Sequence, residues 1–215
     1  LTDSGYKTNK TGFGFGTSFE YQDDVIIGIG QDSFYEKIET NSSASKRQKA
    51  QAGNYWDTFL NIDLDYDKRN QKYKTSDGFR SFYAVNLPVI RENNSLTNTN
   101  IFSFFEELYQ DNVTKLSFYA KSSTSLTNDD IKLSERIFLP GHRLRGFVSG
   151  GVGPKDGNDF IGGNYASSVN IQTSIPQLMP NIQNMDVSMF LDAGNVWGID
   201  YDSSLSDTNK IRSSI

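Results

Sequence analysis

Two residues of this chain have types and positions that suggest a specific interaction. They are an arginine in a glycine-rich segment and an acidic residue in a later strand. Arg145 lies in LPGHRLRGF, residues 139–147, and GGVGPKDGNDFIGGN follows shortly after it. A guanidinium group donates hydrogen bonds and accepts none, so it needs acceptors. Asp192, in the strand-like segment FLDAGNVW, is the obvious candidate, because a carboxylate accepts from both nitrogens of the fork. Taken alone, Arg145 also fits a solvated loop residue and Asp192 an ordinary polar strand residue.

No other group of residues forms a catalytic or metal-binding pattern. His142 is the only histidine and the chain has no cysteine, so neither a zinc site nor a Ser/His/Asp arrangement is indicated. Asp63, Asp65 and Asp67 occupy alternate positions of a strand-like segment, which predicts an acidic row rather than a calcium loop. We therefore expect no enzymatic activity, no metal and no cofactor.

The composition restricts the class of protein. The chain has 215 residues, of which 36% are hydrophobic, which is low for a soluble globular domain. It contains no apolar run of about 18 residues, so a transmembrane helix is not expected. A mean hydropathy of −0.54 neither favours nor excludes a membrane barrel, because the lumen of such a barrel is polar. With a net charge of −5, and the cluster Lys46, Arg47 and Lys49 fitting a solvated loop tip, a nucleic-acid partner is not expected.

Apolar and polar residues alternate in many segments, which predicts strands. The clearest segment is 55–67, where Trp56, Leu60 and Ile62 share one face and Asp57 lies on the other. The remaining strands are expected at residues 13–21, 25–29, 79–87, 100–109, 114–121, 165–175 and 186–193, with the start of a ninth at 211–215. The facing of 100–109 is undecided, and residues 1–7 fit the tail of an earlier strand.

The predicted connections between strands alternate along the chain between a shorter and a longer group. Those around residues 22–24 and 110–112 are tight, and those at 67–78 and 176–184 are moderate. The others are long and are expected at residues 36–53, 91–99, 122–159 and 198–210. Short turns on one rim and long loops on the other are typical of an outer-membrane barrel with extracellular long loops. A soluble β-sandwich would also show the alternation, so the alternation alone decides nothing.

Three separated motifs resemble the outer-membrane β-barrel assembly family, the BamA-like or bacterial surface antigen proteins. These motifs are Leu144-Arg145-Gly146-Phe147, Gly162-Gly163-Asn164 and the Asp192–Trp197 stretch that contains Gly194. The resemblance implies an all-β fold: an antiparallel up-and-down meander of about eight to nine strands, forming an incomplete part of a transmembrane β-barrel. It also implies that residues 1–215 are a fragment that lacks the first strands, the last two strands and the upstream periplasmic domains.

The resemblance also implies roles for single residues. In this family the loop, here about residues 122–159, folds into the barrel lumen, and its arginine pairs with inward-facing acidic residues. Asp192 is one expected partner of Arg145, and Gln172 stands where many relatives carry a second acid. Gly146 is expected to allow a tight bend, Phe147 to anchor the loop tip, and Gly162 and Gly163 to mark a bulge or a close backbone approach.

The function implied by the resemblance is that of the central barrel component of the machinery that folds and inserts β-barrel proteins into the outer membrane. The expected partners are unfolded outer-membrane proteins, accessory assembly lipoproteins and outer-membrane lipid, in a Gram-negative cell envelope. The alternatives are a protein-translocating relative, either a two-partner secretion transporter or a translocation-and-assembly homologue. A passive porin or a soluble β-sheet binding module is less favoured.

Overall fold

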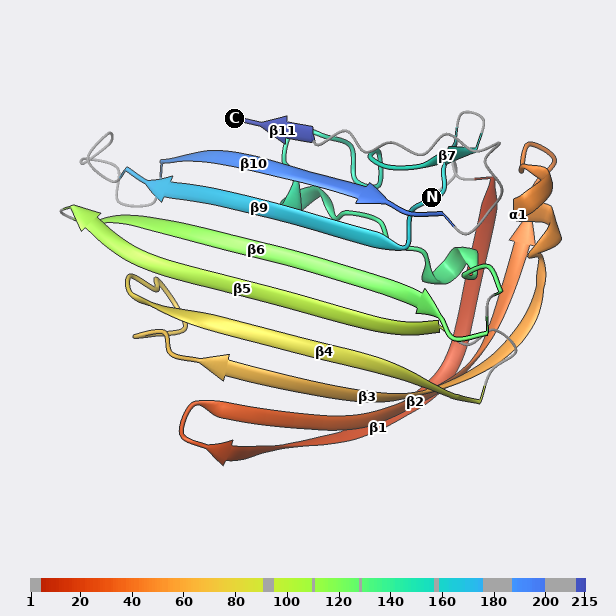
Figure 1. Cartoon of the computed structure of the whole chain (residues 1–215), viewed down its shortest axis with the longest axis horizontal. Helices are drawn as coiled ribbons and strands as arrows, with labels where there is room; N and C mark the ends of the chain where they lie inside the picture. Colours follow the sequence, from red (N-terminus) through yellow and green to blue (C-terminus); the bar gives the residue numbers. More distant parts are fainter. Residues whose placement is uncertain are drawn as a thin grey trace.

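A computed structural model describes residues 5–90, 95–109, 111–127, 129–156, 159–175, 187–199 and 212–215, except for the side chain of Arg47. The described residues form one curved antiparallel sheet of nine strands, in the order β1-β2-β3-β4-β5-β6-β9-β10-β11 (Figure 1). Its strands are β1 (Tyr6–Gln22), β2 (Val25–Thr40), β3 (Gly53–Asp67), β4 (Gly78–Ile90), β5 (Ser95–Tyr109), β6 (Asn112–Ser125), β9 (Tyr165–Ser174), β10 (Ser188–Trp197) and β11 (Arg212–Ser214). This all-β meander, which is not closed in the described residues, confirms the predicted fold class.

The two faces of the sheet differ in chemistry. Large apolar side chains are exposed on the outer face, among them Trp56 and Ile62, as the alternation predicts. The undecided strand β5 follows the same rule, because Phe102 and Phe104 are exposed whereas Ile101 and Phe105 line a cavity on the inner face. Polar side chains and a long inserted segment occupy the inner face. No helix in the described part of the chain is long and apolar enough to cross a membrane.

Several predicted boundaries were wrong. Strand β2 continues to Thr40, and the capped helix α1 (Lys46–Ala50) follows, where a loop over residues 36–53 was expected. The second half of β2 contains Glu36, which is buried, and Lys37 and Glu39, which are exposed, so charged residues interrupt the apolar alternation and the sequence gives no strand signal there. Tyr6 and Lys7 pair with Thr40 and Glu39 as part of β1, and therefore do not belong to an earlier strand. Residues 1–4 of the tail expected at 1–7, the turn at 176–184 and most of the loop at 198–210 lie outside the described residues.

The segment between β6 and β9, residues 126–164, is named the inserted loop. It differs from the expected range of 122–159, because β6 runs to Ser125 and β9 begins at Tyr165. Its short elements are η1 (Leu133–Glu135), η2 (Gly141–Arg143), β7 (Lys155–Asp156) and β8 (Asp159–Phe160). Its buried side chains Ile137, Leu139, Leu144 and Val152 pack against the inner-face residues Tyr119, Ala166 and Val196. This apolar cluster fixes the inserted loop on the inner face of the sheet.

Candidate functional site

Arg145 of the inserted loop forms a bidentate ion pair with Asp192 of β10. The guanidinium donates from Nε to Oδ2 at 2.8 Å and from Nη2 to Oδ1 at 2.7 Å. The backbone N–H of Arg145 also donates to Oδ2, at 3.0 Å. The Asp192 side chain is 0% exposed and that of Arg145 is 29% exposed. Parallel, charge-assisted bonds of this kind fix orientation as well as distance, so the pair holds the loop in one position.

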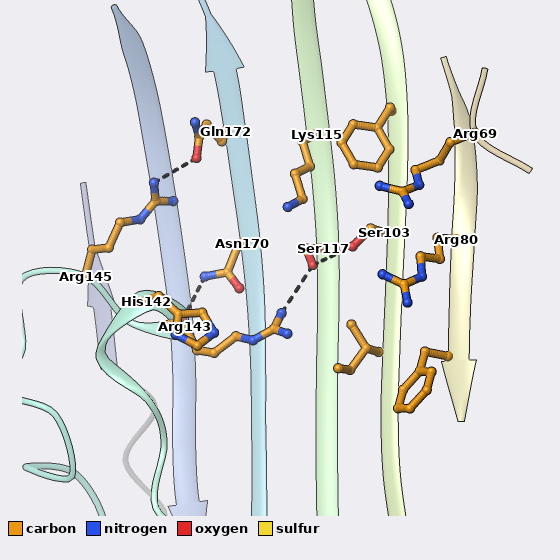
Figure 2. A pocket seen from close by; sticks show the side chains of 13 residues that line it. Arg69, Arg80, Ser103, Lys115, Ser117, His142, Arg143, Arg145, Asn170 and Gln172 are labelled. Carbon is orange, nitrogen blue, oxygen red and sulfur yellow. Dashed lines mark hydrogen bonds between the residues drawn. The ribbon is translucent and has the colours of Figure 1, made fainter. Parts of the chain in front are cut away.

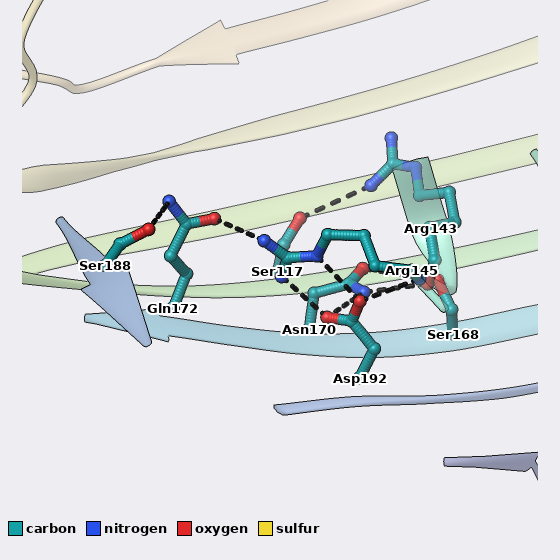
Figure 3. A network of polar contacts seen from close by, with 8 residues as sticks. All are labelled: Ser117, Arg143, Arg145, Ser168, Asn170, Gln172, Ser188 and Asp192. Carbon is teal, nitrogen blue, oxygen red and sulfur yellow. Dashed lines mark hydrogen bonds and ion pairs between the residues drawn. The ribbon is translucent and has the colours of Figure 1, made fainter. Parts of the chain in front are cut away.

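Neighbouring polar groups complete the pair (Figure 3). Gln172 of β9 accepts from Nη1 of Arg145 at 2.9 Å, so an amide stands where the resemblance implied a second acid. Asn170 donates to Asp192 Oδ1 at 2.9 Å and to the backbone carbonyl of Arg143 at 2.7 Å. The Arg145 guanidinium stacks on the ring of Phe190, 3.8 Å from its centroid. We call Arg145, Asp192, Gln172 and Asn170 the arginine clamp.

The electrostatics of the clamp keep Arg145 charged. The hydrogen bonds to Asp192 raise the pKa of the Arg145 guanidinium above its ordinary range, against the opposing effect of burial. Arg145 therefore stays charged at neutral pH. It works as a fixed structural contact, not as an acid or a base.

The motif residues around Arg145 hold the loop tip. Leu144 is buried in the apolar cluster, and Phe147 packs against that cluster from its edge. Gly146 has a φ of +81°, a conformation that residues with a Cβ rarely adopt. The structure thus places a positive φ at Gly146 and Phe147 at the edge of the apolar cluster, the two positions singled out in the sequence.

The other two motifs lie together at one end of β9 and β10. A Cβ on Gly163 would lie 2.5 Å from the Trp197 carbonyl oxygen, so the close backbone approach is possible only for glycine. Asn164 accepts from Arg136 Nη1 at 3.2 Å, and Trp197 stacks on Tyr165 with centroids 5.9 Å apart. Gly162 lies against Ile137 and Gly194 against Leu139, both in the inserted loop. These motif residues join the inserted loop to the two strands, and nothing in their contacts indicates catalysis.

A second polar contact of the inserted loop was not predicted. Lys132, 1% exposed, pairs with Asp57 of β3 and, at 2.9 Å, with Glu36 Oε2 of β2. Glu135 approaches Lys132 Nζ to 3.7 Å. Ser134 donates to Glu36 at 2.8 Å. We call this group the lysine anchor. The sequence gives little indication of the lysine anchor. Alternation placed Asp57 on the polar face of its strand, but Glu36 was assigned to a loop.

The lysine anchor keeps its charge in spite of burial. Burial by itself lowers the pKa of Lys132, but the bond to Asp57, together with Glu135 and Glu36, raises that pKa above its ordinary value of 10.5. The ring of Tyr55 also lies under the ammonium, 4.6 Å away. Lys132 is therefore a charged group that joins the inserted loop to the strands at the other side of the sheet.

Among the described residues, no group of three or more His, Cys, Asp or Glu side chains is arranged to hold a metal ion. His142, the only histidine, is exposed and lies at the edge of a cavity beside the arginine clamp. The cavity has a volume of about 600 Å³ and opens on the inner face (Figure 2).

An antiparallel sheet with an apolar outer face and a loop fixed to a polar inner face defines the wall of a transmembrane β-barrel. The chain belongs to the Omp85 superfamily, whose domain model matches residues 2–215. It is similar in fold to the crystal structure of BamA from Haemophilus ducreyi lacking POTRA domains 1–3, with a TM-score of 0.78 and 20% identity. The match covers 90% of this chain and 42% of that chain. No curated protein matched in the sequence comparison.

Proposed function

We propose that the protein containing this chain folds and inserts β-barrel proteins into the outer membrane. Membership of the Omp85 superfamily supports the coarser statement, an outer-membrane barrel of the insertion and transport class. The chain spans less than half of the BamA chain that it matches, so activity, substrates and partners remain proposals. The work is non-enzymatic: its free energy comes from completing strand hydrogen bonds and burying apolar surface in lipid.

The observation that carries this proposal is the arginine clamp. Three hydrogen bonds from Arg145 to one buried carboxylate hold the inserted loop against β9 and β10. A loop fixed in this way stiffens the wall. A barrel that pairs with incoming strands elsewhere needs such a part of its wall to keep its shape.

The partners follow from the same proposal. Unfolded outer-membrane proteins would be the substrates, and accessory assembly lipoproteins would bind the full-length protein. The exposed apolar outer face suits contact with outer-membrane lipid. The rim formed by the longer connections would be extracellular.

The test replaces the two charged members of the clamp in the full-length protein in its own host. Arg145→Ala and Asp192→Ala are each expected to lower the amount of folded, heat-modifiable porin in the outer membrane. Val148→Ala is the matched control, because Val148 is in the same loop and its side chain is exposed. Normal porin assembly together with lost secretion of a dedicated partner protein would instead favour a protein-translocating function. Normal assembly and normal secretion would remove the clamp from the mechanism.

A further inference from the structure

The cavity beside the arginine clamp carries an excess of positive charge, although the whole chain has a net charge of −5. Among its described lining residues, five are cationic and none is a carboxylate; the cations are Arg69, Arg80, Lys115, Arg143 and Arg145. They come from the β3–β4 turn, from β4 and β6, and from the inserted loop, and their charged ends point toward a common space (Figure 2). The lining of this cavity is therefore positively charged even though the chain as a whole is negatively charged.

Three of these cations are paired with carboxylates that are not among the lining residues of the cavity. Arg69 forms two bonds of 2.7 Å with Asp67. Arg80 donates to Asp65 at 2.8 and 2.7 Å. Arg145 belongs to the clamp with Asp192. Each of these guanidinium groups is held in a bidentate pair, and the remaining nitrogen of Arg145 donates to Gln172.

The other two cations, Lys115 and Arg143, have no carboxylate partner among the described residues. Lys115 Nζ lies 5.5 Å from the centroid of the Phe105 ring. The Arg143 guanidinium lies 4.9 Å from the centroid of the Tyr119 ring and donates to the Ser117 hydroxyl at 3.4 Å. Like charges that share a partly enclosed space repel each other unless a counter-charge lies between them.

We propose that this cavity binds a small soluble oxyanion of the phosphate type, with Lys115 and Arg143 as its principal ligands. The Ser103 and Ser117 hydroxyls lie on the same wall and are hydrogen-bonded to each other, 3.0 Å apart, which leaves one of the two O–H groups to donate to an anionic oxygen. The cavity is on the inner face, opposite the apolar outer face, so a water-soluble anion has access to it. This site goes beyond the proposed assembly function.

Binding of the anion would have a mechanical consequence. Arg143 belongs to the inserted loop and Lys115 to β6 of the wall, so one anion between them joins the two. It would act next to the arginine clamp, because Asn170 bonds both Asp192 and the backbone carbonyl of Arg143. The bound anion therefore helps to hold the inserted loop to the wall, and release of the anion would weaken that attachment.

The experiment is a calorimetric titration of the full-length protein, in an uncharged detergent, with inorganic phosphate at constant ionic strength. Saturable binding is expected. Lys115→Gln and Arg143→Gln should each weaken it by roughly tenfold or more, because each removes one charged ligand. Lys121→Gln is the matched control: it lies on the same strand, at a position of the same parity as Lys115, and does not line this cavity. Its binding should equal that of the wild type.

Several results would overturn the proposal. One is the absence of phosphate binding, as expected if another part of the full-length protein supplies a carboxylate to the cavity. Another is an equal loss in all three variants, which would indicate general charge attraction. Binding of a soluble short-chain phosphatidic acid without binding of free phosphate would assign the site to a lipid headgroup instead. If Arg143→Gln fails to fold, Lys115→Gln with its Lys121→Gln control still decides the question.

Discussion

The inserted loop is held at two places that differ in chemistry. At the lysine anchor, one compact ammonium is 1% exposed and lies between carboxylates that are 0% and 2% exposed. At the arginine clamp, a planar guanidinium remains 29% exposed and makes paired bonds to a single buried carboxylate. The first contact depends on complete burial, and the second depends on the geometry of a fork.

The two contacts also join different parts of the sheet. The lysine anchor reaches β2 and β3, whereas the clamp reaches β9 and β10, which lie five strands further along the sheet order. The inserted loop therefore crosses the inner face and connects two distant parts of the wall. From this we infer that the loop stabilises the curvature of the sheet, and that each contact is needed for it.

The largest effect is expected from Lys132→Met. This variant leaves Glu36 and Asp57 buried beside each other with only Lys10, 3.4 Å from Glu36 Oε1, as a described cation, which should lower the free energy of unfolding by about 3–5 kcal/mol. Urea unfolding of the full-length protein, together with protease cleavage within the inserted loop, measures the effect. Lys155→Met is the matched control, since Lys155 is in the same loop and its ammonium lies 4.3 Å from the centroid of the Phe160 ring, with no carboxylate partner among the described residues. Equal effects of the two variants would show that burial at the lysine anchor is unimportant.

An exchange of the cation types should give a smaller loss at both places. Arg145→Lys removes the paired bonds and should destabilise the loop by about 1.5–3 kcal/mol, because an ammonium cannot match both carboxylate oxygens. Lys132→Arg should destabilise by about 1–3 kcal/mol, because the larger group overpacks a closed site. Protease cleavage rates of the loop report both. If either variant behaved like the wild type, the idea that the clamp needs a planar guanidinium and the anchor a compact ammonium would be contradicted.

Alkaline pH should separate the two contacts without a mutation. The pKa of Lys132 is raised in the folded protein above its ordinary value of 10.5, so its stabilising contribution is complete below that value and is lost as the pH rises through the folded-state pKa. Each pH unit of that loss corresponds to about 1.4 kcal/mol. Arg145 keeps its charge throughout. Loop cleavage measured up to about pH 11 should therefore increase in the wild type and not in Lys132→Met, whose anchor is already lost. A parallel increase in both would attribute the effect to other groups.

Much of the wall and of the clamp could be predicted from the sequence. Period-two alternation located the strands, and it placed Asp192 on the same polar face as Gln172 because strand residues alternate strictly. The lysine anchor could not be predicted, because Lys132 and Asp57 are 75 positions apart and no local pattern joins them. Helix α1 was missed although Ser45 and Gln48 form a capping box that is readable from the sequence. Local periodicity thus gives facing, whereas pairing across the inner face depends on the folded sheet.

The smallest effect is expected at Gln172, the uncharged acceptor of the clamp. Gln172→Glu would place a carboxylate 2.9 Å from Arg145 Nη1, opposite Lys115 in the strand register. The new charge should slow loop cleavage and stabilise the clamp by about 0.5–1 kcal/mol, because the site is partly solvated. Gln172→Ala is the control and should weaken the clamp slightly. The same new carboxylate would also compete with phosphate for Lys115, so Gln172→Glu should tighten the loop while weakening phosphate binding. If Gln172→Glu strengthened both the attachment of the loop and the binding of phosphate, or strengthened neither, the clamp and the cavity would be electrostatically independent.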